Sequence, residues 1–107
     1  MNKEEFLKAK KILEEEFEAK KKQLAKEYAY SNNDVKIGDV ITDHYKTIRV
    51  EKFLWGYDFG TRLSCMYYRG TRLNKKGEPM KRDAGDNRVS QTDIREINGK
   101  PYKFEFK

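Results

Sequence analysis

The pattern of the chain changes near Tyr30, and this change sets what the chain can fold into. Up to that residue, apolar side chains recur at helical spacing among charged ones, whereas residues 31–107 form short apolar runs separated by Gly, Asn and Asp. Helical spacing over this length indicates one long amphipathic helix, and the short runs indicate strands joined by turns. We therefore expect an α+β protein with an N-terminal helix over residues 1–30 and a small β domain over residues 31–107.

The predicted helix carries a narrow apolar stripe. Its members recur at intervals of seven, four, seven and four residues: Phe6, Leu13, Phe17, Leu24 and Tyr28. Such intervals place side chains on one face of an α-helix. Asn2 followed by Glu5 is a relative of the capping box, so the helix is expected to begin near Lys3. The run Ser31-Asn32-Asn33 favours its end, because short polar side chains compete for the helical backbone.

The stripe must pack against something. A helix of about 26 residues is about 39 Å long, which exceeds the size of a small barrel, so part of the stripe is expected to extend beyond the β domain. In one interpretation the stripe docks on the chain's own β domain. In the other, its N-terminal half pairs with a second copy of the chain or with a helix of another protein.

The β domain is predicted to hold five or six short strands. Residues 35–41 and 102–106 have strand composition, and residues 63–73 and 88–90 are two further candidates. Residues 47–51 alternate strictly, and the aromatic residues after them continue on the opposite parity, which predicts a bulge near Glu51-Lys52. Asn98-Gly99 predicts a two-residue hairpin, and Asn74-Lys75-Lys76-Gly77 predicts a longer hairpin loop whose Gly is left-handed.

The order of these pieces resembles SH3-like barrels. The resemblance rests on the start Lys36-Ile37-Gly38-Asp39-Val40-Ile41, on the alternating second strand and on Val89-Ser90-Gln91-Thr92-Asp93-Ile94. In SH3-like barrels a short helical turn precedes the last barrel strand. The resemblance covers about residues 35–97 and implies a five- to six-stranded antiparallel SH3-like β-barrel after the helix.

A second resemblance covers most of the chain. It is carried by Ser31-Asn32-Asn33, Lys36-Ile37-Gly38-Asp39, Asp43-His44, Ile48-Arg49-Val50-Glu51-Lys52, Tyr67-Tyr68-Arg69-Gly70, Lys76-Gly77-Glu78-Pro79 and Lys81-Arg82. These segments look like those of uncharacterised small proteins from gut Bacteroidetes and their phages. The resemblance implies a bacterial or phage origin and assigns no functional residue.

Motifs of catalysis are missing from the sequence. It has no Gly-x-Gly-x-x-Gly, no Walker-type Gly-Lys-Ser/Thr, no Gly-x-Ser-x-Gly and no His-Glu-x-x-His. One cysteine, Cys65, and one histidine, His44, exclude an intrachain disulfide framework and a four-ligand zinc site of the usual type. We expect a protein that is not an enzyme and has no cofactor. No apolar run approaches membrane-spanning length, so we expect a cytoplasmic protein without a membrane partner.

The excess positive charge lies in the β domain. The chain has a net charge of +6, and residues 1–30 hold 8 basic and 7 acidic side chains, which leaves +5 on residues 31–107. Basic side chains concentrate around the predicted 74–77 loop: Arg69, Arg72, Lys75, Lys76, Lys81, Arg82 and Arg88. Cations gathered on a projecting hairpin suit backbone phosphates. They equally suit a solvated hairpin tip that blocks edge pairing.

Aromatic residues are the second candidate group. The group has more aromatic side chains than one face of a small barrel needs: Trp55, Tyr57, Phe59, Tyr67 and Tyr68. Most are expected in the core, and Trp55 and Tyr57 are candidates to stack on bases. Our first hypothesis is a non-enzymatic nucleic-acid-binding accessory protein that uses the basic hairpin. The alternative is a protein-interaction adaptor, with the helix for oligomerisation or docking and a barrel groove for an acidic or extended peptide.

Overall fold

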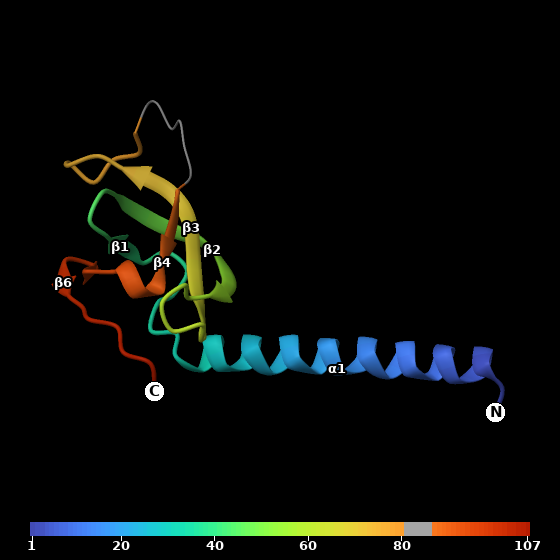
Figure 1. The fold of residues 1–107 in the computed structure, drawn as a ribbon. Coiled ribbons are helices and arrows are strands. Elements are labelled where there is room, and N and C mark those ends of the chain that lie inside the picture. The colour runs from blue at the N-terminus through green and yellow to red at the C-terminus, as the bar shows by residue number, and fades with distance from the viewer. Residues whose placement is uncertain (81–86) are drawn as a thin grey trace.

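The structure is a computed structural model that describes residues 1–80 and 87–107. A long helix leaves one end of a small β domain and projects away from it (Figure 1), so the molecule measures 68 × 32 × 23 Å. The elements, in chain order, are α1 (Lys3–Ser31), β1 (Val40–Thr42), β2 (Thr47–Tyr57), β3 (Ser64–Leu73), β4 (Arg88–Ser90), the 3-10 helix η1 (Gln91–Asp93), β5 (Glu96–Ile97) and β6 (Lys100–Pro101). The predicted α+β class and the long N-terminal helix are confirmed.

Helix α1 begins and ends where local chemistry predicts. The Asn2 side-chain oxygen accepts the backbone N–H of Glu5 at 2.8 Å, which satisfies one of the free donors of the first turn. At the other end, the Asn32 N–H donates to the carbonyl of Ala29 at 3.2 Å. Ala29 is the one buried residue of the helix, so only its last turns contact the β domain. Among the described residues, no helix combines the length and apolarity that spanning a membrane requires.

The six strands form one antiparallel sheet in the order β4-β3-β2-β1-β5-β6. Strands β2 and β3 make the longest pair, from Thr47↔Leu73 to Tyr57↔Ser64. Within the described part of the chain the outermost strands β4 and β6 do not pair, so the sheet is open. The predicted antiparallel sheet is therefore confirmed, whereas its closure into a barrel is not.

The predicted bulge is present in β2. The register of β2 against β3 shifts between Val50 and Lys52, so Val50 faces Gly70 and Lys52 faces Arg69. The shift keeps the apolar side chains before and after the bulge on one face of the sheet. It also brings the two backbones together, because a Cβ on Gly70 would lie 1.7 Å from the carbonyl oxygen of Arg49. Glycine is thus a requirement of the bulge.

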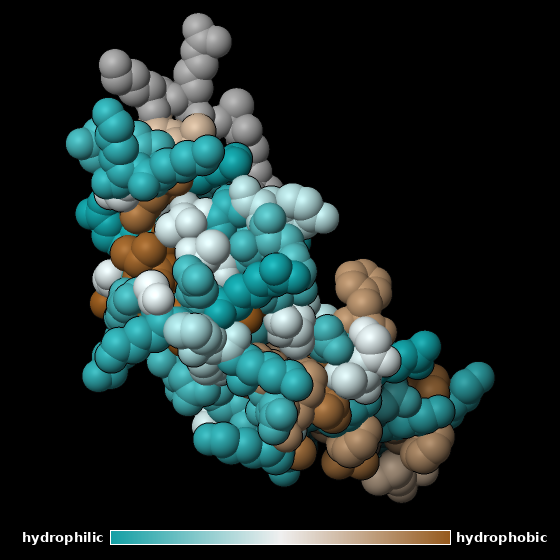
Figure 2. Space-filling model, turned by 90° about the vertical axis from the view of Figure 1, so that its left-hand side faces the viewer, coloured by the Kyte–Doolittle hydropathy of each residue, from teal (hydrophilic) through white to brown (hydrophobic). Residues whose placement is uncertain are grey.

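The core lies between this face of the sheet and the C-terminal end of α1. Its buried members come from the helix, four strands and the segments between them: Ala29, Val35, Ile41, Ile48, Val50, Met66, Tyr68, Val89 and Ile94. Outside the core, the surface seen in Figure 2 is mostly hydrophilic, with many of the visible hydrophobic residues gathered toward its lower right. Such a distribution fits a chain that is 39% charged.

A buried glutamine joins the helix end to the sheet. The Gln91 side chain accepts the backbone N–H of Met66 at 3.0 Å and donates to the backbone carbonyl of Asn32 at 2.8 Å. Gln91 is 1% exposed, so it satisfies two backbone groups that lie away from water. The side chain holds the last turn of α1 against β3.

The strand predicted over residues 35–41 was wrong in part and the one over residues 102–106 was wrong, whereas both hairpin predictions were confirmed. Only the end of residues 35–41 is a strand, because Gly38 has φ +94° and turns the chain before Val40. Residues 102–106 are not a strand, since β6 ends at Pro101 and the following tail bonds to the end of α1, where the Lys107 N–H donates to the Asn32 side chain at 3.3 Å. Asn98 and Gly99 have φ of 54° and 79°, and Gly77 has φ +80°, as left-handed hairpin residues require.

Candidate nucleic-acid interface

Three cations stand side by side on the face of the sheet opposite the core. Lys52 on β2 is paired with Arg69 on β3, and Arg69 is paired with Arg88 on β4. Residues that face each other across antiparallel strands project on the same side, so these three side chains form one row, here called the basic row. All three are exposed. Like charges directly opposite each other are unfavourable in a sheet, and an anion bound between them would relieve this repulsion.

An aromatic pocket adjoins the basic row. The Arg88 guanidinium lies 5.3 Å from the centre of the Tyr67 ring, which is cation-π geometry. The same ring lies against Gly56, where a Cβ would come within 2.9 Å of a ring carbon, and its hydroxyl donates to the Tyr57 carbonyl at 2.9 Å. Glycine on one side and a hydrogen bond at the end hold the ring flat along the sheet.

The pocket has a volume of about 600 Å³. Its lining includes two exposed aromatic side chains, Tyr57 and Phe59. The Phe59 side chain is fully exposed to water. Trp55 also lines the pocket but is half-buried against the core and meets Tyr57 edge to face at 5.7 Å. The exposed rings offer flat apolar surface of the kind on which bases stack.

Charges of both signs line the aromatic pocket. Its lining includes Arg88 and the carboxylates of Asp58 and Asp93. Burial raises the pKa of the Tyr67 hydroxyl, and Asp58 adds to this rise while Arg88 opposes it. A phosphate is therefore attracted by Arg88 and repelled by the two carboxylates.

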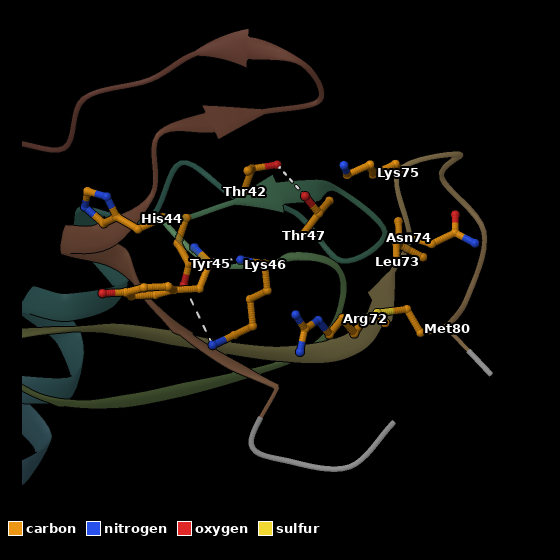
Figure 3. A pocket seen from close by; sticks show the side chains of 11 residues that line it. Thr42, His44, Tyr45, Lys46, Thr47, Arg72, Leu73, Asn74, Lys75 and Met80 are labelled. Atoms are coloured by element: carbon orange, nitrogen blue, oxygen red, sulfur yellow. Dashed lines mark hydrogen bonds and ion pairs between the residues drawn. The ribbon is translucent and has the colours of Figure 1, made fainter. Parts of the chain in front are cut away.

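A second cavity, shown in Figure 3, lies at the other end of the same strands. It has a volume of about 470 Å³ and holds the cations Lys46, Arg72 and Lys75. Lys46 is already paired with Asp43 at 3.7 Å, whereas among the described residues Arg72 and Lys75 have no ion pair. Tyr45, in the turn between β1 and β2, is 86% exposed at the rim. This cavity thus repeats, on a smaller scale, the combination of cations with an exposed ring.

The predicted basic residues fall into separate places rather than one cluster. Arg69 and Arg88 belong to the basic row, and Arg72 and Lys75 line the cavity of Figure 3. Lys76 lies exposed in the turn after Asn74, outside that lining. Lys81 and Arg82 lie outside the described residues.

The predicted stripe of α1 is largely uncovered. Phe6, Leu13, Phe17 and Leu24 are all exposed. Tyr28 is half-buried, and its hydroxyl donates to the Lys107 carbonyl at 2.8 Å. The stripe therefore docks on the β domain at its C-terminal end only.

Sequence reasoning missed Lys52, Arg49 and Tyr45. Lys52 completes the basic row, and Arg49 lies on the same face two residue pairs along, opposite Thr71. The sequence held a signal for Lys52, because a bulge at Glu51-Lys52 places Lys52 on the outer face of the sheet. Matching Lys52 to Arg69 required the strand register, which no local pattern supplies.

In the part of the chain that the structure describes, no group of three or more His, Cys, Asp or Glu side chains is placed to bind a metal ion. Burial raises the pKa of the Cys65 thiol, which disfavours the reactive thiolate. Comparisons with family models, curated proteins and solved structures found no match.

Proposed function

We propose that this protein is a non-enzymatic module that binds single-stranded nucleic acid on the outer face of its sheet. The observation that carries the proposal is the basic row, because three exposed cations on adjacent strands form a ready site for consecutive phosphates. The row borders a pocket with exposed aromatic rings. Cations for the backbone beside rings for the bases are the usual elements of single-strand binding.

The geometry also suggests how the strand lies. Phosphates would follow Lys52, Arg69 and Arg88, since the carboxylates of Asp58 and Asp93 in the lining of the aromatic pocket repel them. A base next to the Arg88 phosphate then reaches Tyr57 and the surface around Tyr67. The contacts are to backbone charge and to ring faces, so we expect little sequence preference.

We further propose that the β domain is a variant of the SH3-like small barrel. Two features support this assignment. The chain forms a meander from β1 to β4, and a 3-10 helix then precedes β5, which returns to pair with β1. The bulge in β2 supplies the bend that such a barrel needs. The bacterial or phage origin implied by the second resemblance stays part of this proposal.

Binding is tested by fluorescence anisotropy with labelled single-stranded DNA, duplex DNA and RNA over a range of salt concentrations. Three phosphate contacts on a single strand predict a slope of log K against log salt of about −2, hence a loss of about 20-fold between 50 and 200 mM salt. The double variant Lys52→Glu/Arg69→Glu is expected to lower the slope to about −0.7 or to abolish binding, because it removes two of the three contacts.

The control variant makes an equal change in net charge elsewhere on the β domain. Lys100→Glu/Lys103→Glu alters two exposed lysines away from the basic row. Equal weakening by both double variants would show that net charge alone acts, which contradicts the assignment to the row. A further variant, Arg72→Glu/Lys75→Glu, tests the cavity of Figure 3 separately. If only that variant loses binding, the site lies there instead, and no binding at low salt rejects the proposal.

A protein-interaction adaptor is the second candidate, and the uncovered stripe of α1 favours it. Exposed Phe6, Leu13 and Phe17 form a surface that suits another amphipathic helix. If the protein is an adaptor, Lys52→Glu/Arg69→Glu leaves binding to the partner protein unchanged, whereas polar substitutions at Leu13 and Phe17 abolish it. The two functions are therefore separable by which variant fails.

A further inference from the structure

The stripe of α1 leaves large apolar side chains in water. Phe6, Leu13, Phe17 and Leu24 are 55%, 65%, 61% and 69% exposed. Most of α1 projects beyond the β domain (Figure 1), and Leu24 lies where the helix reaches it. A chain with only 36% hydrophobic residues has few to spare, so four on one line of a helix point to a covered surface.

The four exposed members of the stripe have the same spacing in both directions. Phe6, Leu13, Phe17 and Leu24 are separated by seven, four and seven residues, which is symmetric about a point near Glu15. Tyr28, the fifth member, is half-buried against the β domain. When two such helices pair antiparallel about that point, Phe6 meets Leu24 of the partner subunit, and Leu13 meets Phe17 of the partner subunit. Each of the four exposed members then faces another apolar member, which is the isologous contact that a two-fold dimer requires.

Charge and shape at the ends agree with this register. Lys3 falls opposite Glu27 of the partner subunit, an opposite-charge pair. Lys10 falls opposite Lys20 of the partner subunit, and this like-charge pair keeps the association moderate. The stripe also runs into an open groove of about 520 Å³ between α1 and the β domain, lined by Leu24, Tyr28 and Leu63. In the antiparallel register this groove receives the first helical turn of the second copy.

We propose that the occupant of the stripe is a second copy of this chain, bound as an antiparallel helix pair with its two-fold axis near Glu15. The exposure of the stripe suits a helix of another protein as well, whereas the symmetric spacing favours self-pairing. The pair places the two β domains at opposite ends of a rod. Their helix ends lie about 48 Å apart, because 16 residues separate Glu15 from Ser31 on each side.

Sedimentation equilibrium of the full chain tests the dimer. We expect a concentration-dependent monomer–dimer equilibrium with a dissociation constant in the micromolar range, of order 10 µM, as four apolar pairs and two unfavourable lysine pairs predict. Leu13→Glu is expected to weaken the dimer by at least about 100-fold, because the contact occurs twice across the two-fold axis. A monomer at all concentrations overturns the proposal.

The matched control is Ile12→Glu. Ile12 is 54% exposed on the same helical turn, but it lies about 100° around the helix from Leu13 and outside the stripe. The two variants make the same apolar-to-acidic change in the same environment, so their helical content by circular dichroism should match. Equal weakening of the dimer by both variants contradicts the role of the stripe.

Orientation is tested by a spin label on Glu4→Cys, measured by pulsed electron resonance. Cys65 is fully buried, so the label goes to the exposed position 4. In the antiparallel pair the two labels are at least about 33 Å apart along the axis, since position 4 lies level with position 26 of the other copy. Labels closer than about 20 Å would show a parallel pair and overturn the symmetric register.

Discussion

Replacing Gly70 with alanine tests whether the bulge in β2 depends on a close backbone approach. An added Cβ would lie 1.7 Å from the carbonyl oxygen and 2.6 Å from the carbonyl carbon of Arg49. Ordinary contact begins near 3.4 Å, so the two strands would have to separate by about 1.7 Å at this point. The atoms nearest to the added Cβ all belong to the backbone, so a side-chain rotation cannot remove the clash.

The expected cost follows from what the separation breaks. Strands moved this far lose one or two ladder hydrogen bonds at about 1 kcal/mol each. Val50, which faces Gly70, is 1% exposed, and partial loss of its packing adds about 1–2 kcal/mol. The sum is about 2–4 kcal/mol in the free energy of unfolding. At about 4–8 °C per kcal/mol for a domain of this size, Tm should fall by about 8–32 °C.

Thermal and urea denaturation followed by circular dichroism measure this change. Gly60→Ala is the control, because the nearest atom to its added Cβ is a side-chain oxygen of Asp58 at 3.5 Å and its φ is not positive. We expect the control to change the free energy of unfolding by less than about 0.5 kcal/mol or to stabilise the protein slightly. If Gly70→Ala unfolds at the parent temperature, the bulge does not require glycine and the strand register is wrong.

Two further predictions concern buried polar groups. Gln91→Leu should lower the free energy of unfolding in urea by about 2–4 kcal/mol, because it leaves the Met66 N–H and the Asn32 carbonyl buried without partners, and an unchanged midpoint would contradict the contact. The second concerns Tyr68, whose pKa is raised by burial. Its stabilising effect is present below about pH 10, where the unfolded tyrosine is still protonated, and is lost as pH rises further. Tyr68 alone should lower stability by up to about 1.4 kcal/mol per pH unit above pH 10. Tyr68→Phe should therefore make the slope shallower without removing it, because burial also raises the pKa of Tyr102; an identical slope in both proteins would refute this prediction.

The features that sequence predicted well depend on neighbouring residues alone. Asn2 caps α1 because its side chain reaches an N–H three positions later. Asn98-Gly99 adopts positive φ because these residue types tolerate it. The bulge followed from the parity change between residues 48–50 and 53–55. Each of these decisions is local, so no tertiary knowledge was needed.

The features that sequence missed depend on partners distant along the chain. Residues 102–106 alternate like a strand, yet they pair with no strand of the described sheet. The C-terminal tail bonds to the end of α1 instead. The basic row needs Lys52, Arg69 and Arg88 to align across three strands, and a slip of one residue would send each to the other face. The predicted hairpin grouped basic residues by their distance in sequence, whereas the register grouped them by face.

The basic row and the stripe of α1 lie on opposite sides of the sheet, and Tyr57 lines both the aromatic pocket and the groove beside α1. Helix α1 meets the core face, where the Ser64 hydroxyl donates to the Ala25 carbonyl at 2.6 Å and Ala29 is buried. Lys52 and Arg69 project from the other face. Pairing of two helices therefore leaves both basic rows open and directs them to the two ends of the rod. If both proposals hold, a dimer built this way would bind two segments of one long strand, and its gain over a monomer would depend on how well the strand between them spans the rod.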